Sequence, residues 1–449
     1  MRSLKLLVLF LLLAAPTLRA QTRLALDQAV ATALEKNPER KAAVFHRQAA
    51  AAGVKEARAA LLPKITFHEG YLRSNDPVFV FGSKLRQQRF GAGDFALNVL
   101  NTPTPFGNFS TGFSGAWQLF DSGATWLRVS QAKQMSSMAD RRLERTDQQL
   151  VYRVIDAYMG LLLAARQLQV AEDAVKTSQA ILDRSNSRFE SGMVVESDLL
   201  NAKVDFAARR QEFIRSQSTV LIARANLNRE LGVPLDTDYQ PAEILAERVF
   251  PAASEPDLEK LALERRPDFA AANLQSDLQR KSESIAKAAL GPRVNAFAGW
   301  QTDNQHFAGG GGNNWTAGVE VQVDLFSGGA KLARLQAERA LANEASALRD
   351  SMMSGVRVEV RKAYLEFDSA QQQVNVARAA VEQAKESLRI SQNRYEGGLI
   401  TISDLLRTSD ASRRAETDYW QAVYRLHTSY ANLELATGTL DANSPVVKP

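Results

Sequence analysis

The chain is 449 residues long, with 23% charged residues, a formal net charge of +5 and no cysteine. We therefore expect neither disulfide bonds, nor thiolate metal sites, nor a lipid anchor on an N-terminal cysteine. Basic and acidic residues are interspersed as on solvated helix surfaces, which argues against a nucleic-acid-binding protein, whose basic residues usually gather on one face.

Residues 1–20 have the pattern of a cleaved secretory signal. Arg2 and Lys5 precede an apolar run at 6–15, and a small residue ends the segment. About ten apolar residues are too few to cross a bilayer, which takes roughly 20 in a helix, and no later segment comes close to that length. Removal of the signal takes away three basic residues and no acid, so the formal charge falls from +5 to +2. We expect an exported protein without a transmembrane helix in its mature form.

The rest of the chain contains an internal duplication. At an offset of 206 residues the copies share short motifs, with Phe120 over Phe326, Arg188 over Arg394, Asp198 over Asp404 and Asn226 over Asn432. Upstream the offset is 229, so the first copy carries 23 extra residues. We place a first repeat at 21–232, an inter-repeat linker at 233–256, a second repeat at 257–438 and a C-terminal tail at 439–449.

Each repeat is predicted to contain a helix, two strands, a very long helix and a further helix. In chain order, the first repeat has strands near 64–73 and 109–119, a long helix at 122–190 and a last helix at 197–231. The second repeat has strands near 293–301 and 315–325, a long helix at 328–396 and a last helix at 402–437. The fold class is therefore mainly α with a small β part.

The two long helices carry a seven-residue period. Large apolar residues recur every seven positions, and a row of small residues lies three positions after them, which permits knobs-into-holes packing. The large residues are Val154, Leu161, Leu168, Val175, Leu182 and Phe189, and in the second repeat Val360, Phe367, Val374, Val381, Leu388 and Tyr395. At 1.5 Å per residue such a helix is roughly 100 Å long, which no single globular domain needs. The pattern predicts a coiled coil.

The predicted strands alternate between apolar and polar residues. Over 315–325 the odd positions are apolar and the even positions are mostly polar, and 109–119 shows the same period of two. Such segments fit strands of an outer-membrane barrel or a half-buried hairpin of a soluble domain, and the signal and the long helices favour the barrel. Four strands cannot close a barrel, and an open strand edge in lipid is costly, so the wall must be shared between copies of the chain.

Two loops connect the strands. Residues 306–314 contain four consecutive glycines and read as a flexible turn, because no Gly-Lys-Ser/Thr follows as in a phosphate loop. The insertion at 75–106 is either a surface loop or a plug over the mouth of the barrel.

Several motifs together resemble the TolC-type outer-membrane efflux proteins. They are Leu62-Pro63 after the first helix, Leu119-Phe120-Asp121-Ser122-Gly123 and Leu325-Phe326-Ser327-Gly328-Gly329 after the strands, and Arg188-Phe189-Glu190-Ser191-Gly192 and Arg394-Tyr395-Glu396-Gly397-Gly398 after the long helices. Each motif is weak, but their order, doubling and spacing are specific, and the resemblance covers nearly the whole mature chain.

The resemblance implies a homotrimer in the outer membrane with a large periplasmic portion. Twelve strands would form one β-barrel in contact with lipid, continuous with a helical tunnel, and the linker at 233–256 would form a band around the tunnel with the C-terminal tail. Members of this family are passive exit ducts for small molecules, ions or polypeptides. They are engaged by a periplasmic adaptor protein and an inner-membrane pump of the RND or ABC type. No cofactor and no nucleic acid are implied.

The turns after the long helices are candidate docking positions for the adaptor. Gly192 and Gly398 can adopt a positive φ and end a helix cheaply. In the family these turns meet the adaptor, so the resemblance implies docking at Arg188, Gly192, Arg394 and Gly398. Plain helix termination also explains the two glycines.

An entrance gate is implied just beyond these turns. Asp404 matches an acidic position that narrows the tunnel of the family, and Asp198 is its repeat mate; clustered carboxylates there would favour cations. A helix cap is the alternative for Asp404, because Thr401 lies three residues earlier. That explanation fails for Asp198, since Val195 stands at the equivalent position.

An aromatic position completes the implied gate. Tyr395 matches a gate tyrosine of the family, and Phe189 is its repeat mate. Ile400 and Arg407 depart from the gate residues found elsewhere in the family.

Catalytic chemistry has little support in the sequence. The four histidines lie far apart, and no dinucleotide, Walker or nucleophile-elbow motif is present. We expect no enzyme and no metal site. The rival to a duct is a periplasmic or surface coiled-coil scaffold, which would share the heptads but has no need for amphipathic hairpins in both repeats.

Overall fold

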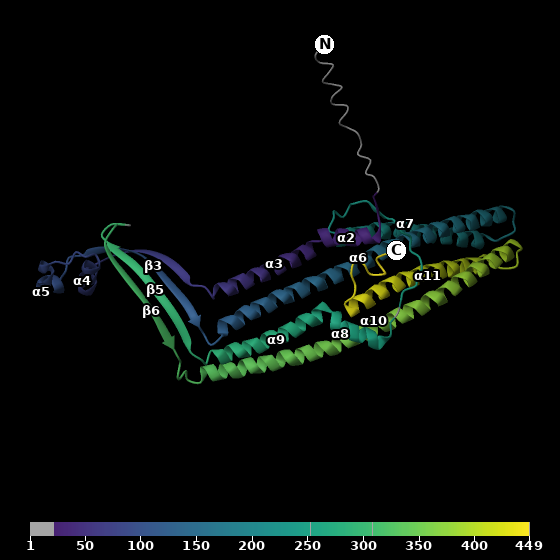
Figure 1. Cartoon of the computed structure of the whole chain (residues 1–449). Coiled ribbons are helices and arrows are strands. Elements are labelled where there is room, and N and C mark those ends of the chain that lie inside the picture. The colour runs from purple at the N-terminus through teal and green to yellow at the C-terminus, as the bar shows by residue number, and fades with distance from the viewer. Residues whose placement is uncertain (1–21, 252, 308, 449) are drawn as a thin grey trace, which may run out of the picture. The chain divides into compact units, whose positions relative to one another are not determined.

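The computed structural model describes residues 22–251, 253–307 and 309–448 (Figure 1). The predicted signal at 1–20 lies outside these residues. The chain divides into two compact units. The helical unit contains the described residues up to Val44, Arg142–Phe269 and the residues from Met353 onward, and the sheet unit contains Phe45–Arg141 and Ala270–Met352.

The two repeats have the same order of elements. The first contains α2 (Leu26–Lys36), α3 (Pro38–Ala59), β2 (Lys64–Ser74), β3 (Phe106–Phe120), α6 (Ala124–Glu190) and α7 (Glu196–Leu231). The second contains α8 (Glu255–Arg265), α9 (Pro267–Ala288), β5 (Arg293–Asn304), β6 (Gly312–Gln322), α10 (Ala330–Glu396) and α11 (Ile402–Thr437). Two short strands, β1 (Thr22–Leu24) and β4 (Tyr239–Pro241), pair in parallel. The chain is thus mainly helical with few strands.

Several elements differ from the sequence-based expectation for physical reasons. Each long helix begins two residues later than expected, because the residues before it adopt positive φ, with φ 57° at Ser122 and 61° at Gly328. The strand expected near 315–325 lies at Gly312–Gln322, because its partner β5 begins at Arg293 and Pro292 before it has no N–H to extend the ladder.

The insertion between β2 and β3 is not a plain loop. It contains the helix α4 (Pro77–Arg86), a 3₁₀ turn (Ala92–Phe95) and the short helix α5 (Leu97–Asn101). Asp76 caps α4 by accepting a 2.8 Å hydrogen bond from the Phe79 backbone N–H, and Pro77 occupies the first helical position, where its missing N–H costs nothing.

A proline splits the opening helix of each repeat, and the break has the same partner in both. Asn37, before Pro38, donates a 2.9 Å hydrogen bond to the Glu230 carbonyl at the end of α7. Arg266, before Pro267, donates a 3.2 Å hydrogen bond to the Ala436 carbonyl at the end of α11. Ala436 lies 206 positions after Glu230, so the two carbonyls are equivalent in the repeats. The residue before the proline is asparagine in the first repeat and arginine in the second. In both repeats its side chain bonds a carbonyl at the end of the last helix.

The glycine after each of these last helices must lack a side chain. Gly232 and Gly438 have φ of 71° and 75°, and a Cβ at either would lie 2.7 to 2.8 Å from the backbone at the helix break, at Lys36 and at Arg266 respectively. The close approach locks the end of α7 against the α2–α3 break and the end of α11 against the α8–α9 break.

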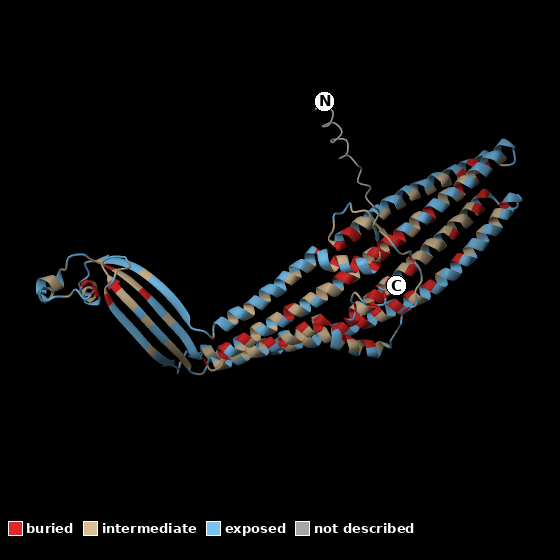
Figure 2. Ribbon diagram, turned by 45° about the horizontal axis from the view of Figure 1, so that its top comes forward, coloured by how far each residue is buried: buried red, intermediate tan, exposed pale blue. Residues whose placement is uncertain are grey.

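The linker and the C-terminal tail both pack into the helical unit. The Tyr158 hydroxyl of α6 donates 2.9 Å to the Leu24 carbonyl and also bonds Glu243 of the linker. Leu245 of the linker and Val446 of the tail are buried. Figure 2 shows buried residues following the helices in broken rows, whereas the edge strands β2 and β6 are mostly exposed and β5 is mostly half-buried in the single chain.

Candidate functional site

The four-stranded sheet has order β2-β3-β5-β6, with every neighbouring pair antiparallel. Residues paired across strands lie on the same face. Phe67 pairs with Phe113, Phe113 with Trp300, and Trp300 with Trp315, so four aromatic residues form one row across the whole sheet. Their ring centroids are 5.3 Å apart for Phe67 and Phe113 and 6.4 Å for Phe113 and Trp300.

The face that carries this aromatic row is apolar over most of its length. Its apolar residues are Ile65, Phe67, Tyr71, Phe109, Phe113, Trp117, Ala296, Ala298, Trp300, Trp315, Ala317, Val319 and Val321. Toward the hairpin turns, the row next to the aromatic row on this face is polar, with Glu69, Thr111, Thr302 and Asn313 in register. An aromatic row that borders an apolar band is typical of the interface of a membrane barrel.

The opposite face of the sheet is polar. It carries Thr66, His68, Ser110, Ser114, Gln118, Asn295, Gln301, Asn314, Thr316, Glu320 and Gln322. Leu72 and Phe297 are apolar exceptions on this face. The Phe297 ring lies over Gly318, where an added Cβ would come within 2.6 Å. In the described residues β2 and β6 each pair on one side only, so the sheet has two free edges.

The turns of the long helices in the helical unit are built alike. Gly192 has φ 72° and Gly398 has φ 74°. After α6, the Met193 N–H bonds the Arg188 carbonyl at 2.8 Å; after α10, the Leu399 N–H bonds the Arg394 carbonyl at 2.8 Å. These are the bonds of a glycine-terminated helix, which satisfy carbonyls that the last turn would otherwise leave free.

The predicted gate aromatics have different surroundings. Tyr395 is 3% exposed and packs with Ile181 of α6 and with Ile402 and Leu405 of α11. Its repeat mate Phe189 is 39% exposed. One aromatic therefore belongs to the local core, and the other lies partly open in the single chain.

A set of contacts that we name the clasp joins the ends of α6 and α10. Arg188 donates to the carbonyls of Tyr395 at 2.9 Å and Glu396 at 2.7 Å, and its guanidinium lies 5.0 Å from the Tyr395 ring centroid. Arg184 forms an ion pair with Glu396, and the buried Ser185 hydroxyl lies 3.3 Å from the Tyr395 hydroxyl. A cation at these carbonyls also opposes the negative end of the helix dipole.

The repeat mate of Arg188 is placed differently. Arg394 is exposed, and within the described ranges no hydrogen bond or ion pair of its side chain is recorded. Exposed apolar side chains lie beside it and on the other turn, with Leu399 71% and Met193 73% exposed.

The two predicted gate carboxylates also differ. Asp404 accepts from the Thr401 hydroxyl at 2.8 Å, its own N–H donates to that oxygen at 3.2 Å, and it pairs with Arg407 at 3.4 Å. The capping contact is therefore present, and the Asp404 side chain is still 45% exposed. Asp198 is half-buried in the first turn of α7, and its N-cap residue Val195 makes no side-chain cap.

A charged network that the sequence did not single out joins α7 to α11. Arg209 contacts Asp205 at 2.9 Å and Asp410 at 3.2 Å, and Arg413 contacts Asp410 at 2.7 Å and Glu212 at 2.9 Å. Burial raises the pKa of Asp410, but the bond from Arg413 and the surrounding guanidinium charges outweigh it and hold that pKa below its usual value. In the sequence, this network is indicated only by the opposite charges that α7 and α11 carry.

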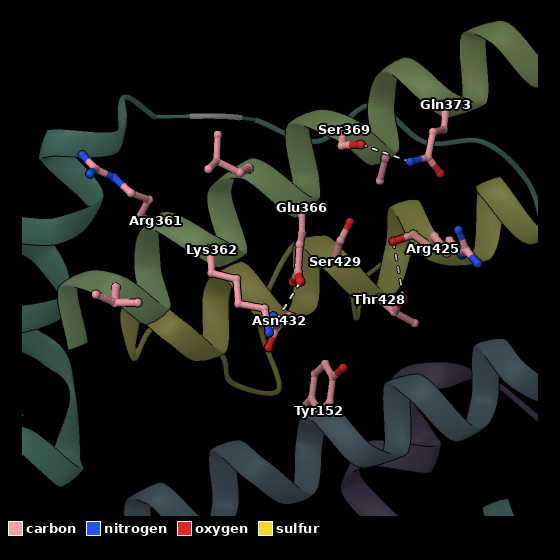
Figure 3. Close-up of a pocket in the computed structure, with 13 residues that line it drawn as sticks. Tyr152, Arg361, Lys362, Glu366, Ser369, Gln373, Arg425, Thr428, Ser429 and Asn432 are labelled. Atoms are coloured by element: carbon pink, nitrogen blue, oxygen red, sulfur yellow. Dashed lines mark hydrogen bonds and ion pairs between the residues drawn. The ribbon is translucent and has the colours of Figure 1, made fainter. Parts of the chain in front are cut away.

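A groove of about 700 Å³ runs between α10 and α11 (Figure 3). Its lining mixes polar residues such as Lys362, Glu366 and Arg425 with the apolar Val358 and Leu365. Val358 and Leu365 are 67% and 55% exposed. No helix among the described residues is long and apolar enough to cross a membrane. No group of three or more metal-ligating side chains is found among those residues either.

Comparison with known proteins places the chain in a family. Residues 29–233 and 258–439 match the family model of the outer membrane efflux protein. The chain is 26% identical over 420 residues to the alkaline protease secretion protein AprF of Pseudomonas aeruginosa, covering 91% of this chain and 83% of AprF. It is 26% identical over 425 residues to the outer membrane protein TolC of Vibrio cholerae, covering 91% of this chain and 89% of that protein.

Solved structures show the same fold. CusC superposes with a TM-score of 0.79 at 18% identity, covering 92% of both chains. The outer membrane channel CmeC of Campylobacter jejuni superposes with a TM-score of 0.79 at 17% identity, covering 94% of this chain and 87% of CmeC. The relatives are channel and secretion proteins rather than enzymes. The resemblance inferred from the sequence is confirmed, and the chain belongs to the outer membrane efflux protein family.

Proposed function

We propose that this protein is a passive exit duct of the outer membrane, which carries solutes or polypeptides out of the periplasm and catalyses no reaction. The observation that supports this function most strongly is the two-faced sheet. An apolar face with an aromatic row suits lipid, and a polar face suits a water-filled lumen. A hairpin on a soluble domain would bury its apolar face, whereas Phe67 and Trp315 are 56% and 78% exposed in this chain.

Copies of the chain would close the barrel. The free edges of β2 and β6 would leave backbone groups unpaired in hydrocarbon, at a cost of several kcal/mol each. Joining the β2 edge of one copy to the β6 edge of the next removes both edges. Small barrels begin at about eight strands, and the family resemblance selects three copies and twelve strands.

The helices offer surfaces for the same assembly. Large apolar side chains that have no cover in the single chain lie along α7 and α10: Val204, Leu221 and Ile222, and Val358, Leu365 and Val376. The groove between α10 and α11 follows the same side of α10 (Figure 3). Helices of neighbouring copies would cover these rows and complete a tunnel, with the linker and the C-terminal tail as a band around it.

The clasp would hold the periplasmic entrance closed. Arg188 of the first repeat binds the end of α10 in the second repeat, so the two turns cannot separate without breaking its bonds to the Tyr395 and Glu396 carbonyls. Tyr395 and Phe189 would form the aromatic part of this gate, and Asp404 and Asp198 its acidic part.

A periplasmic adaptor would dock at the turns, and an inner-membrane pump of the RND or ABC type would supply the energy. Gly192 and Gly398 shape the turns, while Arg394 and Leu399 are exposed there. Arg188 would contribute to docking only if the clasp opens, which would couple adaptor binding to gate opening.

Planar-bilayer recording on the purified oligomer tests the proposed function. We expect discrete, cation-preferring channels that form without any nucleotide or second protein. A folded oligomer that binds no lipid and gives no channels would support the coiled-coil scaffold and contradict the duct.

A further inference from the structure

We propose that α4 is a lid that obstructs the external mouth of the duct. The inference rests on the proposed function, in which the polar face of the sheet lines the lumen and its hairpin end, where β2 leads to β3 and β5 to β6, faces the exterior. All residues of the lid and of the sheet belong to the same compact unit.

A buried polar network seats the end of α4 on the sheet. The Gln87 side-chain amide, one residue after α4, donates to Asn108 Oδ1 at 2.7 Å and to the Gly107 carbonyl at 3.2 Å. Asn108 donates to Asp303 Oδ1 at 2.6 Å, and Gln301 donates to Asp303 Oδ2 at 2.9 Å. The network thus runs from the lid across β3 to β5.

The seat lies on the polar face rather than the apolar one. Asp303 pairs with Ser110, and Asn108 precedes Ser110 by two residues, so both lie on the polar face of the sheet. Gln87, Asn108 and Asp303 are 5%, 6% and 0% exposed, although most of the sheet is open in the single chain. The Gln87 amide nitrogen, Asn108 and Asp303 are hydrogen-bonded to one another, whereas Gln87 Oε1 has no partner among the described residues. Buried bonds of this kind favour one arrangement, since their loss would leave further unpaired groups in a site shielded from water.

Gly312 forms the tightest contact of the lid with β6. A Cβ at this glycine would lie 1.8 Å from the Arg86 carbonyl oxygen, so the end of α4 rests directly on the strand. Gly310, two residues earlier in the same turn, has no atom within 4 Å of an added Cβ. The two glycines therefore form a matched pair for testing the seat.

The insertion is folded, and the end of α4 lies against the polar face. Phe90 packs between Phe81 at 4.7 Å and Phe95 at 5.1 Å, and Lys84 pairs with Asp94 at 2.6 Å. Beneath the end of α4 remains a cavity of about 300 Å³, whose lining includes His68, Arg86, Ser114, Gln301 and Thr316. A folded segment whose end is seated on the polar face beside a small cavity narrows the path of a solute along that face.

The test measures access to the lumen from outside the cell. Because the chain has no cysteine, Ser114→Cys places a single thiol on the polar face, below the lid. Intact cells are treated with a membrane-impermeant polyethylene-glycol maleimide, and the labelling rate is compared between the native lid, Gly312→Ala and Gly310→Ala. A further variant replaces residues 77–101 with a short Gly-Ser turn, which the direct pairing of Ser74 with Phe106 permits.

We expect the thiol of Ser114→Cys to react slowly under the native lid and in Gly310→Ala. Gly312→Ala should speed the reaction on the order of tenfold, because overpacking a tight contact shifts an equilibrium by about that factor. Removal of residues 77–101 should speed it further. If Gly312→Ala does not assemble, Gln87→Ala, which breaks the seat without altering a strand, should give a faster reaction in the same direction.

The controls separate failure of the lid from failure of the duct. Val78→Cys, at an 80% exposed residue of α4, should react quickly in every lid-bearing variant. Ala298→Cys, on the apolar face, should stay unlabelled.

Two outcomes would overturn different claims. If Ser114→Cys reacts at equal rates with and without the lid while Ala298→Cys stays unlabelled, the lid is overturned and the duct is left intact. If Ala298→Cys is labelled while Ser114→Cys is protected, the two faces are reversed and the proposed function itself is overturned.

Discussion

Arg188 donates a 2.9 Å hydrogen bond to the carbonyl of Tyr395, whereas Arg394, the repeat mate of Arg188, makes no equivalent contact with the described part of the first repeat. The duplication therefore produces an asymmetric pair of turns from similar motifs. One arginine bridges the ends of α6 and α10, and the other remains exposed. Substitutions at these two positions should consequently have different effects.

Arg188→Ala should open the proposed gate more often than Arg394→Ala. Each hydrogen bond from a charged donor contributes about 1.5 kcal/mol or more, so loss of both should raise the open probability by at least about tenfold. Single-channel recordings of the two variants measure this directly. Equal open probabilities in both variants would show that the clasp does not hold the entrance closed.

The two arginines should also differ in adaptor binding. Arg394→Ala should weaken binding of the adaptor with little change in conductance. The Arg394 side chain is exposed and makes no hydrogen bond or ion pair within the described residues, so its loss should not disturb the gate. Titration of each purified variant with the adaptor gives the comparison. Unchanged affinity in Arg394→Ala would remove this residue from the docking surface.

The network around Asp410 should stabilise the helical unit above acidic pH. Its folded pKa lies below the ordinary value. The stabilisation should therefore be full above that ordinary value, about 3.9, and be lost as the pH falls through the folded pKa. Asp410→Asn should lower the thermal midpoint at pH 7, and its difference from the native protein should shrink toward pH 3. A difference that is constant with pH would contradict an ionic role for this carboxylate.

Glu434 should have the opposite dependence on pH. Burial is the largest cause that raises its pKa to about 7, with a further contribution from the charge of Asp441. A raised carboxyl pKa means that the protonated form is favoured in the fold, so stability declines as the pH rises toward and through 7. Glu434→Gln should raise the thermal midpoint at pH 8 by a few degrees and change it little at pH 5. A lower midpoint at pH 8 would contradict this account.

The glycines after α7 and α11 should not tolerate alanine. Gly232→Ala or Gly438→Ala should each destabilise the helical unit by about 2 kcal/mol or more, because a positive φ is combined with a backbone clash. Gly160→Ala, in the interior of α6 with nothing within 4 Å, should instead stabilise by about 0.5–1 kcal/mol. Chemical denaturation of the three variants measures the contrast, and similar behaviour at all three sites would refute the proposed close approach.

Local patterns in the sequence predict the regular parts of this fold. The heptads of the long helices and the period-two strands can be recognised from neighbouring residues alone. The turns were predicted at Gly192 and Gly398 because glycine adopts positive φ at low cost, and both glycines do so. The helix α4 escapes such a prediction because its apolar run is short, although Asp76-Pro77 carries the signature of a capped helix start.

Contacts between segments that are distant in sequence could not be predicted from local patterns. The clasp joins Arg188 to residues 207 and 208 positions away, and the lid joins Gln87 to strands of both repeats through Asn108. Neither pairing has a local signature, because the same residue types occur at many exposed positions. The different surroundings of Tyr395 and Phe189 likewise arise from packing against α11 and not from the matched motifs.

Cross-linking between strand edges tests the central claim most directly. One cysteine is placed at Thr66 of β2 and a second is scanned over the polar-face positions Thr316, Glu320 and Gln322 of β6, and the protein is oxidised in its native membrane. A closed barrel predicts that one register gives disulfide-linked dimers and trimers of the chain and nothing larger. Monomers at every register, or a ladder that continues beyond three copies, would contradict a closed trimeric barrel.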